Sequence, residues 1–195
     1  NIEFSYTRGY ESPAVAEQDL KGAKRPEQKA INTDSLLQVA ISEARKADGV
    51  VFVGGLNKNE KQDCEGDDRL TLSLPYGQDK LISALAEANP RLSVVLLTGS
   101  CVTMPWLQKV PAVLEAWYGG SEAGNGIADI LFGDVNPSGK LPFTFYANLN
   151  QCSANKLGDY PGDGKNETYK EGLFVGYRYI DQKKLKPLFP FGFGL

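Results

Sequence analysis

The sequence has no histidine, and this absence excludes several kinds of active site. Ser-His-Asp and Cys-His catalysis both need an imidazole as the base. Zinc and haem sites with histidine ligands are excluded for the same reason. Acid/base chemistry within these 195 residues must therefore come from carboxylates, lysine, tyrosine or cysteine.

Cysteine is scarce as well. Cys64, Cys101 and Cys152 lie far apart in the sequence, and no Cys-x-x-Cys motif is present. An odd number leaves at least one cysteine without a disulfide partner in the chain. The pattern indicates neither a disulfide scaffold nor a zinc ribbon. We expect no metal ion and no cofactor.

Long apolar runs and an excess of positive charge are also missing. No stretch of 18 apolar residues occurs, so no transmembrane helix is expected. The 21 basic and 24 acidic residues give a net charge of −3, which argues against a broad nucleic-acid-binding surface. The GxGxxG and Walker A spacings are absent, which disfavours a nucleotide site and a flavodoxin-like cofactor domain.

The chain also shows no signal peptide and no initiator methionine. Because both ends read as the middle of something, we expect a piece of a larger protein. Within it, residues 1–31 are predicted to form a short strand at 2–6 and then a charged loop or linker. Residues 32–195 are predicted to form one α/β domain.

Helices and strands are predicted to alternate after residue 32. Helical spacing of apolar residues predicts three helices. The first starts near Asn32-Thr33-Asp34, the second covers 77–88, and the third covers 122–131 and is ended by Gly133. Apolar runs predict strands at 50–53, 93–97 and 112–117, the first of them buried on both faces. A helical turn at 104–110, an extended segment at 141–146 and a strand at 173–180 complete the prediction. The alternation predicts a layered α/β sandwich with a mainly parallel sheet and helices on both faces.

The loop at 54–69 directly follows a predicted strand. Ligands of such sheets gather outside the carboxyl ends of the strands, so this loop lies at the functional edge. One interpretation is a solvated charged loop, and another is a calcium loop, although the EF-hand spacing is missing. A third is a carboxylic acid delivered to a substrate, because crowded carboxylates raise one another's proton affinity. The loop holds five carboxylates: Glu60, Asp63, Glu65, Asp67 and Asp68.

Two further segments admit a structural or a functional interpretation. The glycine-rich turn at 119–124 could bind an anion at a helix N-terminus, or it could simply make a tight turn in which Glu122 complements the helix dipole. The aromatic segment 189–194 is expected to dock on some other surface, because a free apolar tail is costly in water.

A series of motifs runs through residues 50–195 in a fixed order. The most distinctive are Glu65-Gly66-Asp67-Asp68-Arg69 and the Trp117-Tyr118-Gly119-Gly120 segment. Together the motifs resemble the second, α/β-sandwich domain of family-3 glycoside hydrolases, the β-glucosidase and β-xylosidase family. They lie at 51–57, 65–69, 74–82, 88–90, 104–107, 116–124, 127–134, 136–142, 160–162, 169–179 and 187–195.

The resemblance implies a division of catalytic labour between two domains. In that family a TIM-barrel domain holds a nucleophilic Asp, and the α/β domain lends a Glu as general acid/base, commonly in a Glu-Gly-x-Asp-Arg context. The resemblance assigns this role to Glu65, with Glu60 as the fallback because the loop varies in length. It implies a retaining glycosidase, β-glucosidase-like or a β-xylosidase, that removes terminal non-reducing β-linked sugars. Since the nucleophile is not in this chain, the chain alone is expected to be inactive.

The resemblance also implies the partners of the chain. They are a β-linked oligosaccharide or aryl glycoside, and a TIM-barrel domain on the same protein or on a separate chain, with no nucleic acid and no membrane. A secreted or periplasmic location is expected. The alternative function is a non-catalytic module derived from the family, which would hold sugar or a partner through the 54–69 loop.

Overall fold

The computed structural model describes residues 2–12, 33–59, 61–66 and 68–195. These residues divide into two compact units. The first unit comprises the chain up to residue 69 together with 74–99 and 105–117. The second comprises 70–73, 100–104 and 118–195.

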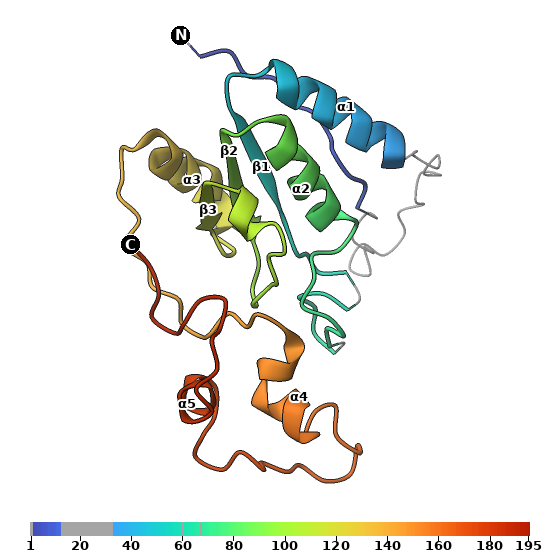
Figure 1. The fold of residues 1–195 in the computed structure, drawn as a ribbon, viewed down its shortest axis with the longest axis vertical. Helices are drawn as coiled ribbons and strands as arrows, with labels where there is room; N and C mark the ends of the chain where they lie inside the picture. Colours follow the sequence, from blue (N-terminus) through green and yellow to red (C-terminus); the bar gives the residue numbers. More distant parts are fainter. Residues whose placement is uncertain (1, 13–32, 60, 67) are drawn as a thin grey trace. The chain divides into compact units, whose positions relative to one another are not determined.

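The first unit is built on a parallel sheet of three strands in the order β1-β2-β3 (Figure 1). The strands are β1 (Val50–Gly55), β2 (Leu92–Leu97) and β3 (Ala112–Glu115). Both neighbouring pairs are parallel, so all three strands end at the same edge. The three predicted strands are confirmed, although β3 ends two residues before the predicted boundary at 117.

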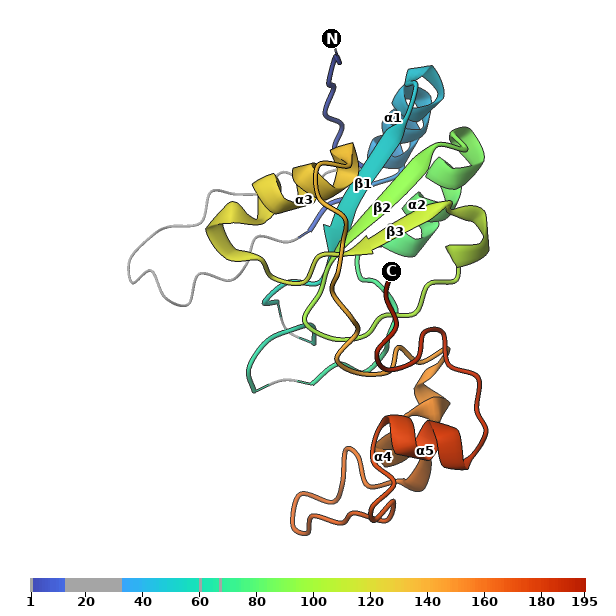
Figure 2. The ribbon, with the colours of Figure 1, turned by 90° about the vertical axis from the view of Figure 1, so that its left-hand side faces the viewer.

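Two helices lie side by side on one face of this sheet, as both views show (Figures 1 and 2). They are α1 (Thr33–Lys46) and α2 (Gln78–Ala88), which pack on each other while α2 also packs on β1 and β2. The predicted apolar face of α2 is confirmed, because Leu81, Ile82 and Leu85 are at most 5% exposed. The predicted turn at 104–110 contains a short 3-10 helix, η1 (Leu107–Lys109).

Burial of the strands follows their place in the sheet. In the central strand β2, Val94 and Val95 point to opposite faces and both are fully buried. In β1, however, Val51 and Val53 are 52% and 50% exposed, while Phe52 is buried. The prediction that β1 is buried on both faces is therefore wrong within the described residues. The reason is that β1 is an edge strand, and α1 and α2 cover only the face on which Phe52 lies.

The predicted strand at 2–6 is also wrong, since residues 2–12 form no strand in the structure. In the described part of the chain they do not join the sheet, which consists of β1, β2 and β3. The segment packs instead on the helices: a Cβ atom on Gly9 would lie 2.5 Å from Leu81 Cδ2. The predicted linker at 13–31 and the capping role of Asn32 fall outside the described residues.

The second unit contains short helices joined by long loops. They are η2 (Gly120–Glu122), α3 (Ala123–Phe132), η3 (Leu149–Gln151), α4 (Ser153–Leu157) and α5 (Tyr177–Gln182). The end of α3 is confirmed, because Gly133 follows it with a positive φ of 82°. The three cysteines of the chain, all within the described part, are present as thiols.

The predicted strand at 173–180 is wrong. Its second half belongs to α5, and its first half is a turn in which the Phe174 N–H donates to Glu171 O at 3.0 Å. Apolar and aromatic residues favoured a strand, but Leu173 and Val175 are 81% and 55% exposed, so burial does not stabilise one. The segment at 141–146, predicted to be extended, bends at 142–143, and its Phe145 forms an antiparallel bridge with Phe189. The aromatic segment 189–194 thus docks on this part of the same unit.

Candidate active site

The loop after β1 follows directly on Gly55, which is held in place by hydrogen bonds to a glutamine side chain. The Gln78 side chain is fully buried: its Oε1 accepts the Gly55 N–H at 2.7 Å, and its Nε2 donates to the Gly55 carbonyl at 2.8 Å. Gly55 has a φ of 144°, and a Cβ atom there would lie 2.1 Å from the Leu97 carbonyl oxygen. The start of the loop is therefore fixed by a side chain from α2 and by close backbone contact with β2.

We expect Gln78→Ala to destabilise the first unit by about 2–4 kcal/mol, because both polar backbone groups of Gly55 would lose their buried partner. Urea unfolding of the protein that contains this chain measures the change. Gln38→Ala on the exposed surface of α1 is the matched control and should change the free energy of unfolding by less than about 0.5 kcal/mol. Equal effects of the two substitutions would contradict the expectation.

Hydrogen bonds made by asparagine and glutamine side chains stabilise the first half of the loop. Asn57 Oδ1 accepts the Asn59 N–H at 2.8 Å, and Gln62 Oε1 accepts the Asn57 N–H at 3.1 Å. The Tyr76 hydroxyl accepts hydrogen bonds from Asn59 Nδ2, at 2.8 Å, and from Gln62 Nε2. Gln62 is only 8% exposed, so this half of a strongly polar loop is an ordered part of the unit.

Asp63 then ties the loop to the end of the neighbouring strand. Its Oδ2 accepts the Gly99 N–H, which follows β2, at 2.6 Å. This short bond to a charged acceptor is of the stronger class of protein hydrogen bonds. Asp63 is therefore an anchor two residues before Glu65.

Glu65 itself lies in an exposed turn. Gly66 follows it with a φ of 79°, a left-handed conformation that glycine adopts without steric cost. Among the described residues, the Glu65 carboxylate has no hydrogen bond or ion pair. Asp68 is also exposed, whereas the fallback Glu60 and the neighbouring Asp67 lie outside the described residues. The structure thus presents Glu65 to solvent on an anchored loop at the carboxyl edge of the sheet.

Glu115, at the end of β3, is a residue that the sequence analysis did not single out. Its Oε2 is buried. Burial raises the pKa of the Glu115 carboxyl to about 7, and the negative charge of Asp63 adds to the increase. The Trp117 N–H and the neighbouring Thr98 favour the charged form but do not outweigh burial. A lone Glu in a predicted strand carried no signal of this environment.

Trp117, which follows β3, has a strained backbone conformation. It has a φ of 52°, which is uncommon for any residue with a side chain as bulky as tryptophan. Its N–H donates to Glu115 Oε1 at 3.1 Å. In the second unit, the glycine-rich turn at 119–124 forms η2 and the first turn of α3, and no side chain caps either helix.

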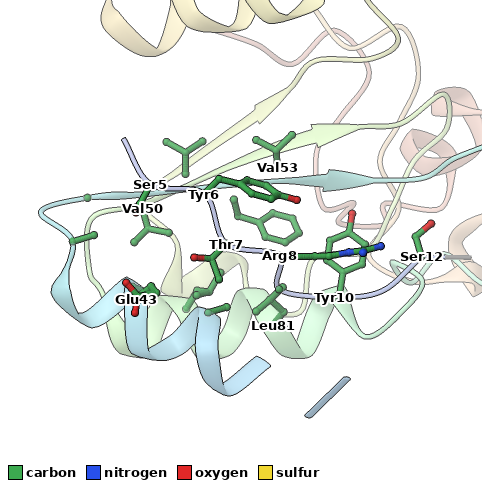
Figure 3. Close-up of a pocket in the computed structure, with 18 residues that line it drawn as sticks. Ser5, Tyr6, Thr7, Arg8, Tyr10, Ser12, Glu43, Val50, Val53 and Leu81 are labelled. Carbon is green, nitrogen blue, oxygen red and sulfur yellow. The ribbon is translucent and has the colours of Figure 1, made fainter. Parts of the chain in front are cut away.

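Two cavities adjoin β1. One of about 430 Å³ lies where residues 5–12 pass between β1 and the two helices (Figure 3), and no residue of the 56–69 loop lines it. The other, about 180 Å³, lies at the base of that loop and is lined by Asn57, Tyr76 and Gln78 among others. The described residues contain no group of three or more cysteine, aspartate or glutamate side chains placed to hold a metal ion. None of their helices has the length and apolar character needed to cross a membrane.

A model of the glycosyl hydrolase family 3 C-terminal domain matches residues 9–177. The chain belongs to this family. Its relatives include β-glucosidase BoGH3A of Bacteroides ovatus, 48% identical over 85% of the chain, and thermostable β-glucosidase B of Acetivibrio thermocellus, 47% identical over 85%. The chain spans about a fifth of the length of these relatives, 22% in each case.

Solved structures of family members share the fold. The β-glucosidase of Kluyveromyces marxianus matches 86% of the chain with a TM-score of 0.80 and 39% identity. DesR, a β-glucosidase from Streptomyces venezuelae solved in complex with D-glucose, matches 84% with a TM-score of 0.78 and 49% identity. The chain covers 20% of each of these structures. The predicted family and the α/β fold class are confirmed.

Proposed function

We propose that this chain is the part of a retaining β-glucosidase that supplies the general acid/base, Glu65, to a site completed by a TIM-barrel domain. The observation that carries the proposal is the anchored loop, which holds an exposed glutamate at the carboxyl edge of the sheet. Membership of the family and relatives named as β-glucosidases support it. The Asp nucleophile then lies outside this chain, either elsewhere in the same protein or on a separate chain.

The mechanism requires Glu65 in two protonation states. As an acid it protonates the leaving glycosidic oxygen while the nucleophilic Asp forms a covalent glycosyl-enzyme. As a base it then takes a proton from the water that hydrolyses this intermediate. Retention requires the two carboxyl groups to lie about 5–5.5 Å apart. The contribution of this chain is a solvent-accessible carboxyl on a loop whose base is fixed at Gly55 and Asp63.

The substrates that we propose are terminal, non-reducing β-linked glucosides, with β-xylosides as the second candidate. β-Linked oligosaccharides and aryl glycosides both offer the leaving oxygen that this chemistry needs. We also propose a secreted or periplasmic location, in which such saccharides are available.

The protein that contains this chain should hydrolyse 4-nitrophenyl β-D-glucoside and cellobiose, and NMR should show the β-anomer of glucose as the first product. Faster cleavage of 4-nitrophenyl β-D-xyloside would move the proposal to a β-xylosidase. The chain expressed alone should show no turnover, because it lacks the nucleophile. An α-anomeric first product would contradict the retaining mechanism, and sugar binding without any hydrolysis would favour a non-catalytic module.

A further inference from the structure

The loop that carries Glu65 is supported by one side chain that lies outside it. The Tyr76 hydroxyl accepts hydrogen bonds from two amide groups of the loop, Asn59 Nδ2 at 2.8 Å and Gln62 Nε2. The direction of the Gln62 bond is fixed, because its Oε1 accepts the Asn57 N–H and the Nε2 end is left to face Tyr76. Tyr76 therefore serves as the acceptor for two residues of the loop at once.

The first half of this loop also closes on itself through its backbone. The Gln62 N–H donates to Asn59 O at 3.1 Å, and the Asp63 N–H donates to Asn57 O at 3.0 Å. Asp63 is the anchor of the loop at the end of β2, and Glu65 follows it after only one residue. Because Gln62 directly precedes Asp63, the position of its side chain helps to determine that of the anchor and of Glu65.

Tyr76 is itself held by its backbone and by its ring. It lies just before α2 and has a φ of 59°, a left-handed conformation that is uncommon for an aromatic residue and that persists where the surrounding structure fixes it. Its ring stacks on that of Tyr10, with centroids 6.5 Å apart and planes at 8°. The centroid of Tyr10 in turn lies 6.3 Å from that of buried Phe52 on β1. Aromatic packing thus sets the place from which the hydroxyl reaches the loop.

The segment that carries Tyr10 makes a second contact with the loop. Asn57 Nδ2 donates to Ser12 Oγ at 3.3 Å. Tyr10, Ser12 and Tyr76 all line the cavity of about 180 Å³ at the base of the loop. They therefore form a common support for the loop, and this support lies entirely within the first unit.

We propose that Tyr76 is a positioning residue of the active site, whose hydroxyl group orders the loop of residues 57–66 so that Glu65 keeps the orientation that proton transfer requires. Tyr76 acts through the loop and takes no part in the proton transfer itself. The inference rests on the proposed function for its effect on catalysis, because it takes Glu65 as the acid. Its effect on the order of the loop is independent of that function.

The effect on the loop is measured by hydrogen–deuterium exchange of the protein that contains this chain. Tyr76→Phe keeps the ring and its stack but removes the acceptor, so the amides of 57–66 should exchange about tenfold faster. The amides of β1 and α2 should exchange at the wild-type rate, because their packing is unchanged. Tyr6→Phe, which removes a hydroxyl from a side chain that is 88% exposed, is the matched control and should leave exchange of the loop unchanged.

The effect on catalysis is measured by the dependence of kcat/KM on the leaving group. Tyr76→Phe should reduce kcat/KM for cellobiose about tenfold, because a misplaced Glu65 transfers its proton less well. For 2,4-dinitrophenyl β-glucoside, whose leaving group departs without a proton, the loss should be less than about twofold. A loss of folded protein would lower both values equally, so the difference between them reports on the position of the acid.

Asn59→Ala tests whether Tyr76 acts through the loop. This variant removes one of the two amides that the hydroxyl holds, and it should show the same leaving-group dependence with a smaller loss. Combined with Tyr76→Phe, it should add less than its separate effect, because both substitutions break the same hydrogen bond. Losses that multiply fully in the double variant would overturn the proposed route.

The two readouts separate failure of this inference from failure of the proposed function. Wild-type exchange of the loop in Tyr76→Phe would overturn the role of Tyr76, whether or not the protein is a glycosidase. Faster exchange with equal losses on the two substrates would overturn it as well. Faster exchange in a protein without glycosidase activity would support the ordering of the loop by Tyr76 and overturn the proposed function. Should Tyr76→Phe fail to fold, equal losses on the two substrates in Asn59→Ala would overturn the inference.

Discussion

Glu65→Ala should reduce kcat/KM for cellobiose by about 10²–10⁴-fold in the protein that contains this chain, because the leaving sugar must then depart without general acid assistance. Formation of the glycosyl-enzyme from 2,4-dinitrophenyl β-glucoside should survive far better, because this leaving group departs without a proton. Hydrolysis of the intermediate should become rate-limiting, since the base is also missing. Azide should then accelerate turnover and yield β-glucosyl azide, because a small anionic nucleophile needs no base and fits the space left by the side chain.

The controls distinguish Glu65 from other carboxylates. Glu65→Gln should lose cellobiose hydrolysis in the same way but should not respond to azide, since its amide fills the space. Glu87→Gln, exposed and paired with Lys109 at 2.7 Å, should retain wild-type kinetics. Wild-type hydrolysis of cellobiose by Glu65→Ala would exclude the assignment, and azide rescue of Glu60→Ala instead would transfer the role to Glu60.

Gly55→Ala should be the most destabilising of the substitutions considered, by about 4 kcal/mol or more. A Cβ atom at this position would lie 2.1 Å from the Leu97 carbonyl oxygen and 2.8 Å from the Leu97 nitrogen. Both atoms belong to the backbone of the central strand, which cannot move without loss of sheet hydrogen bonds. The positive φ of 144° adds strain. Thermal or urea unfolding of the protein that contains this chain gives the change.

Gly77→Ala is the matched control for this expectation. Gly77 also has a positive φ, 72°, but a Cβ atom there would meet nothing within 4 Å. Its substitution should therefore cost only the backbone strain, about 1 kcal/mol. Similar losses for the two variants would show that φ, and not the contact with Leu97, determines the effect.

The parallel sheet and its helices could be predicted because the apolar runs and the helical spacing coincide with the strands and helices that form. The run Val50–Val53 and the apolar spacing in 77–88 both reflect the sheet and α2 that the structure contains. The segment 173–180 misled the prediction because its apolar and aromatic residues belong to a partly exposed turn and a short helix. An apolar segment forms a strand only where a neighbouring strand supplies hydrogen bonds, and the sequence does not reveal that neighbour.

The active site shows the same limit. Glu65 could be proposed because a loop after a strand and a recognisable motif both led to it. Glu115 could not be found in this way, because its properties depend on Thr98 and Asp63, which belong to other parts of the chain. Enclosure of a carboxyl group is a property of the packed edge, and no local pattern around Glu115 encodes it.

The bond between Asp63 and Gly99 also sets the length of a tether. Only Cys64 lies between Asp63 and Glu65, so the two Cα atoms can be at most about 7 Å apart in a fully extended chain. The proposed acid/base is therefore confined to a small volume around a fixed point, which raises its effective molarity toward a substrate held nearby. The same short tether requires any domain that completes the site to bring its nucleophile within this volume, so a small displacement between domains would separate the two carboxyl groups.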